Sequence, residues 1–531
     1  MSGRAPSRPG PDGSGRVVLE LRGITKRFGS LVANDAIDLD LRQGEILALL
    51  GENGAGKTTL MSILFGHYTA DAGSVRVAGP DGRLVALPPG RPRAALAAGI
   101  GMVHQHFALA EALTGFENVT LGTEPLWRPG RRVAAARRRL DGLMRRSGLG
   151  VDLDVPVARL AVGERQRVEI LKALYRDARV LILDEPTAVL TPAESEGLFA
   201  TLRALAGQGL AVAFISHKLG EVLGGSDRVA VLRGGRKVAE RPTAGADRAV
   251  LAELMVGRAV PASRRQARAP GREVLALDGV SVAGPDARNR LDGASLSLRE
   301  GEILGIAGVA GNGQAALARL LFGLARPSAG TVRVNGQVLR RFAPKQAVAL
   351  GIGRIPEDRH HEGVVATMSV AETIAAEGIR TRFQRAGLLR FPAIRARAEA
   401  AIRDYDIRCP GPDAPIRLLS GGNMQKAILA RALDGAPGLI VAAQPTRGLD
   451  VGAVAEVHRR LLDARLRGAG IVLISEDLDE LLALSDRIAV MVRSRLSPAL
   501  ESERLDLTRL GLMMAGQDPD GAARPRDAAG A

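Results

Sequence analysis

One block of sequence is written twice along this chain. LRQGEILALLGENGAGKTTL begins at Leu41, and the matching LREGEILGIAGVAGNGQAAL begins at Leu298. Further matched pairs follow in the same order, among them VLILDEPT, which ends at Thr187, and LIVAAQPT, which ends at Thr446; the last pair contains His217 in the first copy and Glu476 in the second. Self-similarity over such a distance is the mark of a duplicated structural unit. The chain is therefore expected to fold as two copies of one domain, each of roughly 250 residues.

The composition is that of a globular chain with aliphatic cores. Of the 531 residues, 46% are hydrophobic and 3% are aromatic, so the cores form mainly from aliphatic side chains. The formal net charge of +16 leaves two interpretations open: a negatively charged partner such as nucleotide, nucleic acid or an anionic membrane, or a solvated arginine-rich surface. The single cysteine, Cys409, excludes an intrachain disulfide and fits a reducing compartment.

The repeat and the composition together predict the domain boundaries. The link between the two copies is short, basic and rich in Ala and Pro, as linkers commonly are. Both chain ends are rich in Gly, Pro and other small residues, so we expect them to be frayed. The predicted segments are a disordered N-terminus at 1–16, a first domain at 17–257, a linker at 258–272, a second domain at 273–516 and a disordered tail at 517–531.

Within each copy, short apolar runs alternate with amphipathic helical stretches. This pattern predicts an α/β fold, in which a buried parallel sheet carries helices on both faces. No apolar run approaches the length of a membrane-spanning helix. In the first copy the predicted strands are 45–50, 179–185 and 210–216, and helices are expected to follow from Lys57, Gly163 and Lys218.

The segment GENGAGKT, Gly51–Thr58, fits the phosphate-loop pattern G-x-x-x-x-G-K-[ST] between a predicted strand and a predicted helix. Glycines let backbone N–H groups turn toward phosphate oxygens, and the helix N-terminus adds its positive dipole end. Lys57 is placed to hold the β- and γ-phosphates, and the Thr58 hydroxyl to bind Mg²⁺. The segment therefore predicts a nucleoside triphosphate site.

Polar residues at the ends of neighbouring strands complete the predicted chemistry. Asp184 follows the strand VLIL and can reach Mg²⁺, while Glu185 is placed to polarise the attacking water. His217 ends the next strand and can contact the γ-phosphate; alone, a strand-end histidine is usually structural. Gln105 can sense Mg²⁺ and water, and carries weight only through its order and spacing with the others.

In this order, the phosphate loop, GMVHQ, LAVGERQ, LILDEPT and ISH resemble the nucleotide-binding domain of ABC transporters, twice over and across nearly the whole chain. The resemblance implies that each domain has a mainly parallel sheet, an antiparallel β subdomain and a helical subdomain. It also implies that the two domains form a head-to-tail pseudo-dimer. The signature motif of one domain then completes the ATP site of the other.

By this resemblance the first site is a composite. The signatures are LAVGE at 160–164 and LSGGN at 419–423, and Asp450 is expected to reach across the interface. Phe28 matches the aromatic that stacks on adenine, although an ordinary core phenylalanine is the alternative. Nucleotide binding is assigned to Phe28, Gly51, Glu52, Asn53, Gly54, Ala55, Gly56, Lys57, Thr58, Thr59, Ser420, Gly421 and Gly422; Mg²⁺ to Thr58, Gln105 and Asp184; and catalysis to Glu185, His217, Gln105 and Lys57.

The second site departs from the family pattern at nearly every chemical position. Without the lysine and the water-activating glutamate, hydrolysis loses charge neutralisation and nucleophile positioning together. We therefore expect the second site scarcely to hydrolyse ATP. The replacements are Gln314 for the lysine, Ala315 for the Ser or Thr, Ala443 and Gln444 for the Asp–Glu pair, Glu476 for the histidine and Glu357 for the loop glutamine, with Ala161 in the facing signature and Thr191 for the interface aspartate.

A fused pair with a degenerate second half is similar to the ATPase subunits of bacterial monosaccharide and nucleoside importers, with details that favour the nucleoside branch. The resemblance implies ATP hydrolysis that drives uptake of a nucleoside or simple sugar through two membrane permease subunits, at the cytoplasmic face of the membrane. A separate extracytoplasmic protein would bind the solute, which this chain would not touch, and no nucleic acid is expected. The inserts at 106–159 and 358–418 would face the membrane subunits.

Two alternatives come from other classes of twin ATPase. A ribosome-binding translation factor would suit the basic charge, but such proteins usually have a long charged helical connector and two complete sites. A DNA-repair or chromosome ATPase would carry zinc modules or long coiled coils. One cysteine and the lack of sustained heptads argue against that class.

Overall fold

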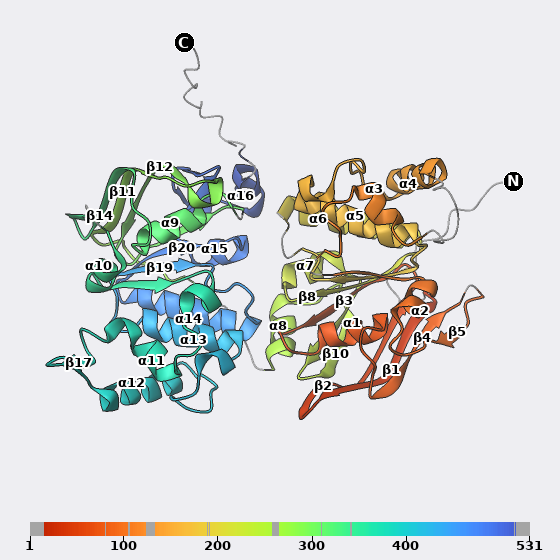
Figure 1. The fold of residues 1–531 in the computed structure, drawn as a ribbon, viewed down its shortest axis with the longest axis horizontal. Coiled ribbons are helices and arrows are strands. Elements are labelled where there is room, and N and C mark those ends of the chain that lie inside the picture. Colours follow the sequence, from red (N-terminus) through yellow and green to blue (C-terminus); the bar gives the residue numbers. More distant parts are fainter. Residues whose placement is uncertain are drawn as a thin grey trace, which may run out of the picture. The chain divides into compact units, whose positions relative to one another are not determined.

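The structure is a computed structural model in which the chain divides into two compact units, Met1–Val260 and Pro261–Ala531, each described here by itself (Figure 1). The predicted frayed tail, and all but the last two residues of the predicted frayed N-terminus, lie outside the described residues. The described residues are 15–79, 81–104, 107–123, 133–187, 190, 192–257, 265–309, 311–339, 342–514 and 516.

A mainly parallel sheet forms the centre of the first unit. Its described strands run in the order β10-β9-β3-β8-β7-β6, and each neighbouring pair is parallel except β9 and β10. Every residue of β3, β7 and β8 is buried, as the apolar runs predicted. The strands are β3 (Ile46–Gly51), β6 (Ile100–Val103), β7 (Val180–Asp184), β8 (Ala211–Ser216), β9 (Arg228–Arg233) and β10 (Arg236–Pro242).

An antiparallel sheet covers one side of this centre. Its described strands run in the order β2-β1-β4-β5. Alternate side chains of β1 and β2, such as Leu19 and Leu39, point into the same core as α1 (Lys57–Phe65). The sheet therefore holds the N-terminus of α1 in place. Its strands are β1 (Val17–Phe28), β2 (Leu31–Arg42), β4 (Ala72–Ala78) and β5 (Leu84–Ala86).

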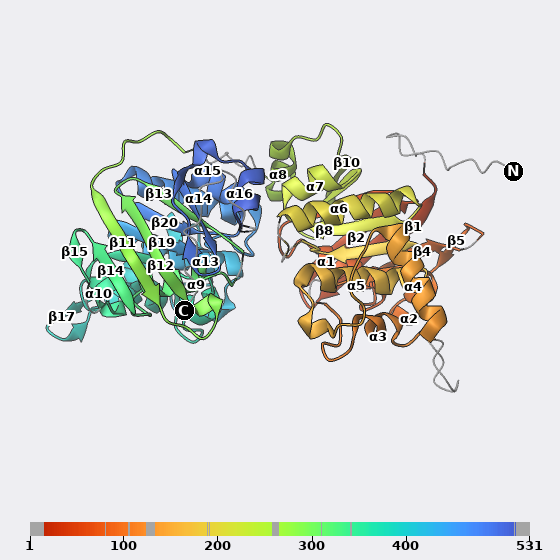
Figure 2. The ribbon, with the colours of Figure 1, turned by 90° about the horizontal axis from the view of Figure 1, so that it is seen from above.

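Helices cover both faces of the parallel sheet (Figure 2). The predicted helix starts are close to the observed ones: α1 begins at Lys57, α5 at Val162 and α7 at Leu219. The further helices of the unit are α2 (Pro92–Ala97), α3 (Gly115–Thr120), α4 (Val133–Ser147), α6 (Pro192–Gly207) and α8 (Arg248–Val256), with α5 ending at Tyr175 and α7 at Gly225.

The second unit repeats this plan, as the duplicated sequence predicted. Its described parallel strands run in the order β16-β19-β20-β13-β21, extended by β22 and β23, beside an antiparallel sheet in the order β12-β11-β14-β15. The strands are β11 (Glu273–Val282), β12 (Leu291–Arg299), β13 (Ile303–Ala307), β14 (Ala329–Val334), β15 (Gln337–Val338), β16 (Ile352–Ile355), β19 (Leu439–Ala443), β20 (Gly470–Ile474), β21 (Arg487–Val492), β22 (Arg495–Leu496) and β23 (Leu500–Glu501).

The helical part of the second unit contains a feature that the sequence did not predict. A small hairpin of β17 (Gln384–Arg385) and β18 (Leu388–Leu389) projects just before α12 (Figure 1).

No helix among the described residues is both long and apolar enough to cross a bilayer. The helices are α9 (Gln314–Leu321), α10 (Pro344–Ala349), α11 (Val370–Ala375), α12 (Phe391–Asp404), α13 (Gly421–Ala432), α14 (Val451–Leu466), α15 (Leu478–Leu484) and α16 (Leu507–Met514).

The described part of the predicted linker is held against the second unit. Arg268 donates a hydrogen bond to the Arg465 carbonyl at 3.0 Å, and Arg465 donates to the Gln266 carbonyl at 2.8 Å. Arg265 donates to the Ser502 hydroxyl at 2.8 Å. Residues 265–272 therefore belong to the surface of the second unit, and residues 258–264 lie outside the described residues.

Candidate nucleotide-binding site

The phosphate loop of the first unit connects β3 directly to α1. Gly56 lies at the N-cap of α1 with φ 96°, and the helix begins at Lys57. A Cβ at Gly51 would lie 2.4 Å from the Leu232 carbonyl oxygen, so this position has no room for a side chain. The pattern glycines are thus required both for backbone conformation and for close packing.

Lys57 is buried and turned back over its own loop. Its Nζ donates hydrogen bonds to the carbonyl oxygens of Gly51 at 2.7 Å and Glu52 at 2.8 Å. Burial lowers the pKa of the ammonium, while the nearby carboxylates of Glu185 and Asp184 act in the opposite direction. A buried cation beside a helix N-terminus is a suitable partner for a phosphate group.

Asp184 lies at the carboxyl end of β7, next to the phosphate loop. Burial, and then the charge of Glu185, raise its pKa to about 6, whereas Lys57 and a hydrogen bond from Thr58 act to lower it. The structure thus brings together the Thr58 hydroxyl and the Asp184 carboxylate. Two oxygen donors beside a phosphate loop are the ligands that Mg²⁺ prefers, so this donor set fits the metal.

Glu185 and His217 form a hydrogen-bonded pair at the ends of neighbouring strands. His217 Nδ1 lies 2.9 Å from Glu185 Oε1, and this hydrogen bond is the main cause of the lowered pKa of Glu185. Glu185 has a positive φ of 46°, and its N–H donates to the Ile215 carbonyl at 3.1 Å. A carboxylate kept ionised and held in a strained backbone conformation is typical of a functional position.

Several supporting residues escaped the sequence reasoning. Asn34 on β2 is buried and donates to the Gly56 carbonyl at 3.1 Å, so it fixes the end of the phosphate loop. Gln166 on α5 donates to the Pro186 carbonyl at 2.6 Å, directly after Glu185. These pairs are distant in sequence, and an isolated Asn or Gln carries no signal of such a contact.

Phe28 ends β1 and is 44% exposed, which argues against the alternative of an ordinary core residue. Its ring meets Tyr68 edge to face with centroids 5.6 Å apart, and Lys26 Nζ lies 5.4 Å from the ring. Tyr68 is a second exposed aromatic that the motifs did not indicate. Gln105 and Thr191 lie outside the described residues.

The phosphate loop of the second unit is closed by its own side chains. Gln314, at the position of Lys57, donates to the Val309 carbonyl at 2.9 Å and accepts from the Asn312 N–H at 3.1 Å. The Asn312 side chain also donates to the Val309 carbonyl at 3.2 Å. A neutral amide replaces the cation here, and the next residue, Ala315, has no oxygen to offer a metal.

At the strand ends that carry the catalytic residues of the first unit, the second unit has the same backbone conformation but different side chains. Gln444, at the position of Glu185, has the same positive φ, 47°, and its N–H donates to the Ile474 carbonyl at 2.8 Å. Its side chain accepts from the Glu476 N–H at 3.3 Å. Glu357, at the position of Gln105, is ion-paired with Arg447.

The two signature helices differ at their N-termini. Ser420 is the N-cap of α13, and its hydroxyl accepts from the Asn423 side chain at 2.9 Å; Gly421 and Gly422 open this helix. In α5 the equivalent Ala161 has no hydroxyl, and its N–H donates to Glu164 at 2.8 Å. A helix N-terminus whose N–H group already donates to a carboxylate of the same helix binds phosphate less well.

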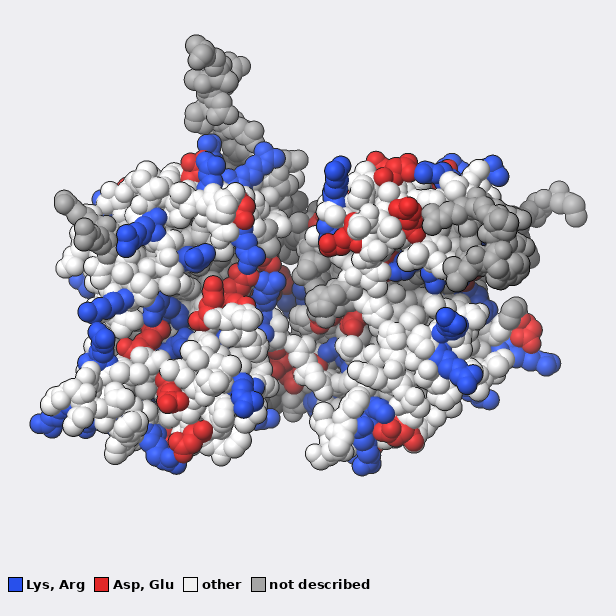
Figure 3. Space-filling model, in the orientation of Figure 1, with Lys and Arg blue, Asp and Glu red and all other residues white. Residues whose placement is uncertain are grey.

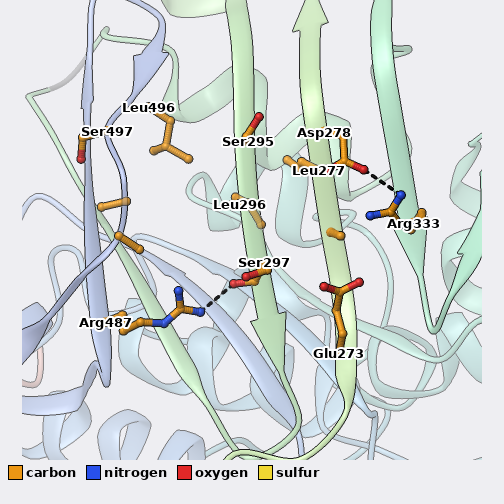
Figure 4. Close-up of a pocket in the computed structure, with 13 residues that line it drawn as sticks. Glu273, Leu277, Asp278, Ser295, Leu296, Ser297, Arg333, Arg487, Leu496 and Ser497 are labelled. Carbon is orange, nitrogen blue, oxygen red and sulfur yellow. Dashed lines mark hydrogen bonds and ion pairs between the residues drawn. The ribbon is translucent and has the colours of Figure 1, made fainter.

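A separate pocket of about 300 Å³ lies on the antiparallel sheet of the second unit (Figure 4). Arg333 pairs there with Asp278 at 2.8 Å, and Arg487 donates to the Ser297 carbonyl at 2.8 Å. None of the residues that line the pocket belongs to a phosphate loop. Both arginines are thus engaged by protein partners, and the pocket shares no residue with the nucleotide site of the first unit.

Comparison with known proteins agrees with this arrangement. The model of the family described as "ABC transporter" matches residues 34–188 and again residues 291–447. The glucose import ATP-binding protein of Haloferax volcanii is 43% identical, with 94% of this chain and 96% of that protein covered. The nucleoside import ATP-binding protein of Lactococcus lactis subsp. cremoris is 40% identical, with 94% of this chain and 98% of that protein covered. A ribose import ATP-binding protein of Burkholderia thailandensis is also 40% identical, with 95% of this chain and 98% of that protein covered.

The matched segments include both phosphate loops and the strand ends that carry Asp184 and Glu185 in the first unit and Ala443 and Gln444 in the second, so the likeness covers these parts of the candidate site as well as the fold. The chain belongs to the ABC transporter family, as an ATP-hydrolysing, ATP-binding protein with two tandem ABC domains.

Proposed function

We propose that this chain powers an importer for a nucleoside or a simple sugar, hydrolysing ATP in its first domain. The observation that carries the proposal is the set in the first unit: buried Lys57, the Thr58–Asp184 contact, and the Glu185–His217 pair at 2.9 Å. The names of the relatives, which are glucose, nucleoside and ribose import proteins, support the direction and the class of solute. The sequence identities to these relatives are similar, so they favour neither a nucleoside nor a sugar as the solute.

The mechanism follows from the placement of these groups. Lys57 and the N-terminus of α1 bind the β- and γ-phosphates of ATP. Thr58 and Asp184 would hold Mg²⁺, which supplies positive charge against the phosphate oxygens when bound. The Glu185 carboxylate accepts a hydrogen bond from the attacking water and orients it, while His217 fixes the orientation of Glu185. Gln105 is assigned a place near the metal and the water.

The same reasoning assigns little or no hydrolysis to the second unit. Gln314 supplies no positive charge, and Gln444 is a weaker hydrogen-bond acceptor for water than a carboxylate. Ala315 and Ala443 have no side-chain oxygen at the positions where Thr58 and Asp184 of the first unit would hold a metal. That Ser420, Gly421 and Gly422 act on the nucleotide of the first phosphate loop stays a prediction from the family resemblance.

The decisive experiment compares matched substitutions in the two units. Glu185→Gln is expected to lower ATP turnover roughly 100-fold or more, because general-base assistance contributes 10²–10⁴-fold. Gln444→Ala alters the equivalent position of the second unit and should leave turnover within about twofold, since that residue has no catalytic group. Steady-state phosphate release from the purified full chain measures both. Near-normal turnover in Glu185→Gln would show that hydrolysis resides elsewhere.

The partners and the location form the other part of the proposal. Two membrane permease subunits and an extracytoplasmic solute-binding protein would complete the importer, with this chain at the cytoplasmic face of the membrane. Uptake of radiolabelled nucleoside, ribose and glucose, in cells with and without the chain, tests the solute class. Loss of efflux with unchanged uptake of all three would contradict an import function.

A further inference from the structure

The hairpin of β17 and β18 exposes large apolar side chains. Leu388 is 75% exposed, Leu389 is 42% exposed and Phe391, the first residue of α12, is 68% exposed. The hairpin stands out from the body of the second unit in both ribbon views (Figures 1 and 2). Clustered exposed leucine and phenylalanine mark a contact surface, whereas single exposed apolar residues do not.

The hairpin is anchored firmly enough to keep these side chains extended into solvent. Its turn, Ala386 and Gly387, has two positive φ angles of 50° and 83°, the pattern of a tight two-residue hairpin. Below the turn, the Arg390 N–H donates to the carbonyl of buried Phe383 at 2.8 Å. Arg382 pairs with Asp434 at 2.6 Å. The apolar tip is therefore held away from the core.

The hairpin also carries uncompensated positive charge. No Asp or Glu lies in the sequence between Glu377 and Glu399, although this stretch is rich in arginine. Arg380, Arg385 and Arg390 are exposed, and none of them forms an ion pair with another described residue. Lys and Arg side chains lie among uncharged surface in this part of the second unit (Figure 3).

We propose that this hairpin is a membrane-surface contact, in which its arginines bind anionic lipid headgroups and its leucines and phenylalanine enter the headgroup–acyl boundary. A guanidinium group can donate two parallel hydrogen bonds to the oxygens of one phosphate. Apolar side chains flanked by basic ones bind at the surface of an anionic bilayer. The occupant is a lipid surface because both faces of a narrow ribbon are exposed. A stable protein interface involves roughly 800 Å² and 20–30 residues on each partner, whereas the two strands of this hairpin have two residues each.

Flotation of the full-length chain with vesicles tests the proposal. Vesicles of phosphatidylcholine with phosphatidylglycerol are compared with pure phosphatidylcholine, at low and high salt. The wild type is expected to bind the anionic vesicles, and less so at high salt. Arg385→Gln with Arg390→Gln should weaken binding roughly 25-fold, since each basic residue near an anionic surface contributes about fivefold. Leu388→Ser with Phe391→Ser should weaken it at least about tenfold.

A matched control removes the same kind of apolar surface elsewhere. Leu31, 64% exposed, and Leu324, 51% exposed, are each changed to Ser; this variant should bind vesicles as the wild type does. ATP turnover and melting temperature should be unchanged in both hairpin variants, because the hairpin is remote from the phosphate loops in sequence and its tip is exposed. These readouts separate a failure of this proposal from a failure of the proposed ATPase function.

The proposal is overturned if the hairpin variants bind anionic vesicles as tightly as the wild type, or if the wild type binds pure phosphatidylcholine equally well. It is also overturned if the hairpin variants keep vesicle binding yet no longer co-purify with membrane subunits in detergent. That result would identify the hairpin as a protein-docking element. Loss of flotation by both hairpin variants, with the Leu31 and Leu324 control intact, supports the lipid contact.

Discussion

The most demanding steric constraint in the first phosphate loop falls at Gly56. A Cβ built there would lie 2.1 Å from the Ala33 carbonyl oxygen and 2.6 Å from Asn34 Nδ2, and φ is 96°. Since Cβ atoms essentially never approach other atoms within 3.0 Å, Gly56→Ala must displace either the loop or β2. No side-chain rotation can relieve a contact with backbone.

The expected cost has two parts. A left-handed conformation costs alanine about 1–2 kcal/mol, and relief of a clash in packed surroundings costs about 1–3 kcal/mol more. The sum, roughly 2–5 kcal/mol, corresponds to a fall in melting temperature of roughly 5–15 °C for a unit of this size. Because a misplacement of about 1 Å near the chemistry can cost roughly 100-fold in rate, ATP turnover should fall by about that factor.

Two glycines serve as controls. Gly245 has a similar φ of 78° with nothing within 4 Å, so Gly245→Ala should lower the melting temperature by only a few degrees and leave turnover within about twofold. Gly313 is the equivalent in the second loop, where a Cβ would lie 2.9 Å from the Arg290 carbonyl oxygen. Gly313→Ala should destabilise the second unit with a far smaller effect on turnover. Thermal melts and phosphate release measure all three, and equal turnover in Gly56→Ala and Gly245→Ala would refute the steric argument.

Two further outcomes are expected. Thr58→Ala should raise the Mg²⁺ concentration for half-maximal hydrolysis roughly tenfold, because one of the protein oxygens assigned to the metal is lost. A metal titration of turnover checks this, and an unchanged midpoint would contradict the assignment. Ser420→Arg should abolish turnover as Lys57→Ala does, whereas Ala161→Arg should do far less. Equal damage from the two arginine substitutions would overturn the assignment of Ser420.

The elements near the phosphate loop were predictable because their sequence signals are local. An apolar run, a glycine-rich turn and Lys57 at the helix start follow one another directly, and the structure begins α1 at that lysine. The buried strands that end at Asp184 and Ser216 gave equally clear signals. Such local patterns depend on the spacing of apolar residues and on the residue types in turns, and both can be read from neighbouring positions in the sequence.

The remainder depends on contacts between distant residues. Asn34 on β2 supports Gly56 at the end of the phosphate loop, and no feature around Asn34 marks that role. The linker composition indicated a tether, yet Arg268 hydrogen-bonds to a helix end far along the chain. The hairpin before α12 has strands of only two residues each, too short for any periodicity to show. Such features depend on tertiary contacts, which sequence patterns do not reveal.

The left-handed backbone at Gln444 has a consequence for how the second unit could change. Its φ of 47° matches the 46° at Glu185, and both N–H groups donate to a carbonyl on the neighbouring strand. This conformation costs about 1–2 kcal/mol for a residue other than glycine, and it persists where no carboxylate uses it. The second unit thus has the main-chain conformation on which the first unit presents its carboxylate, and Gln444→Glu alone, without any change in the chain path, would place a carboxylate at the equivalent point.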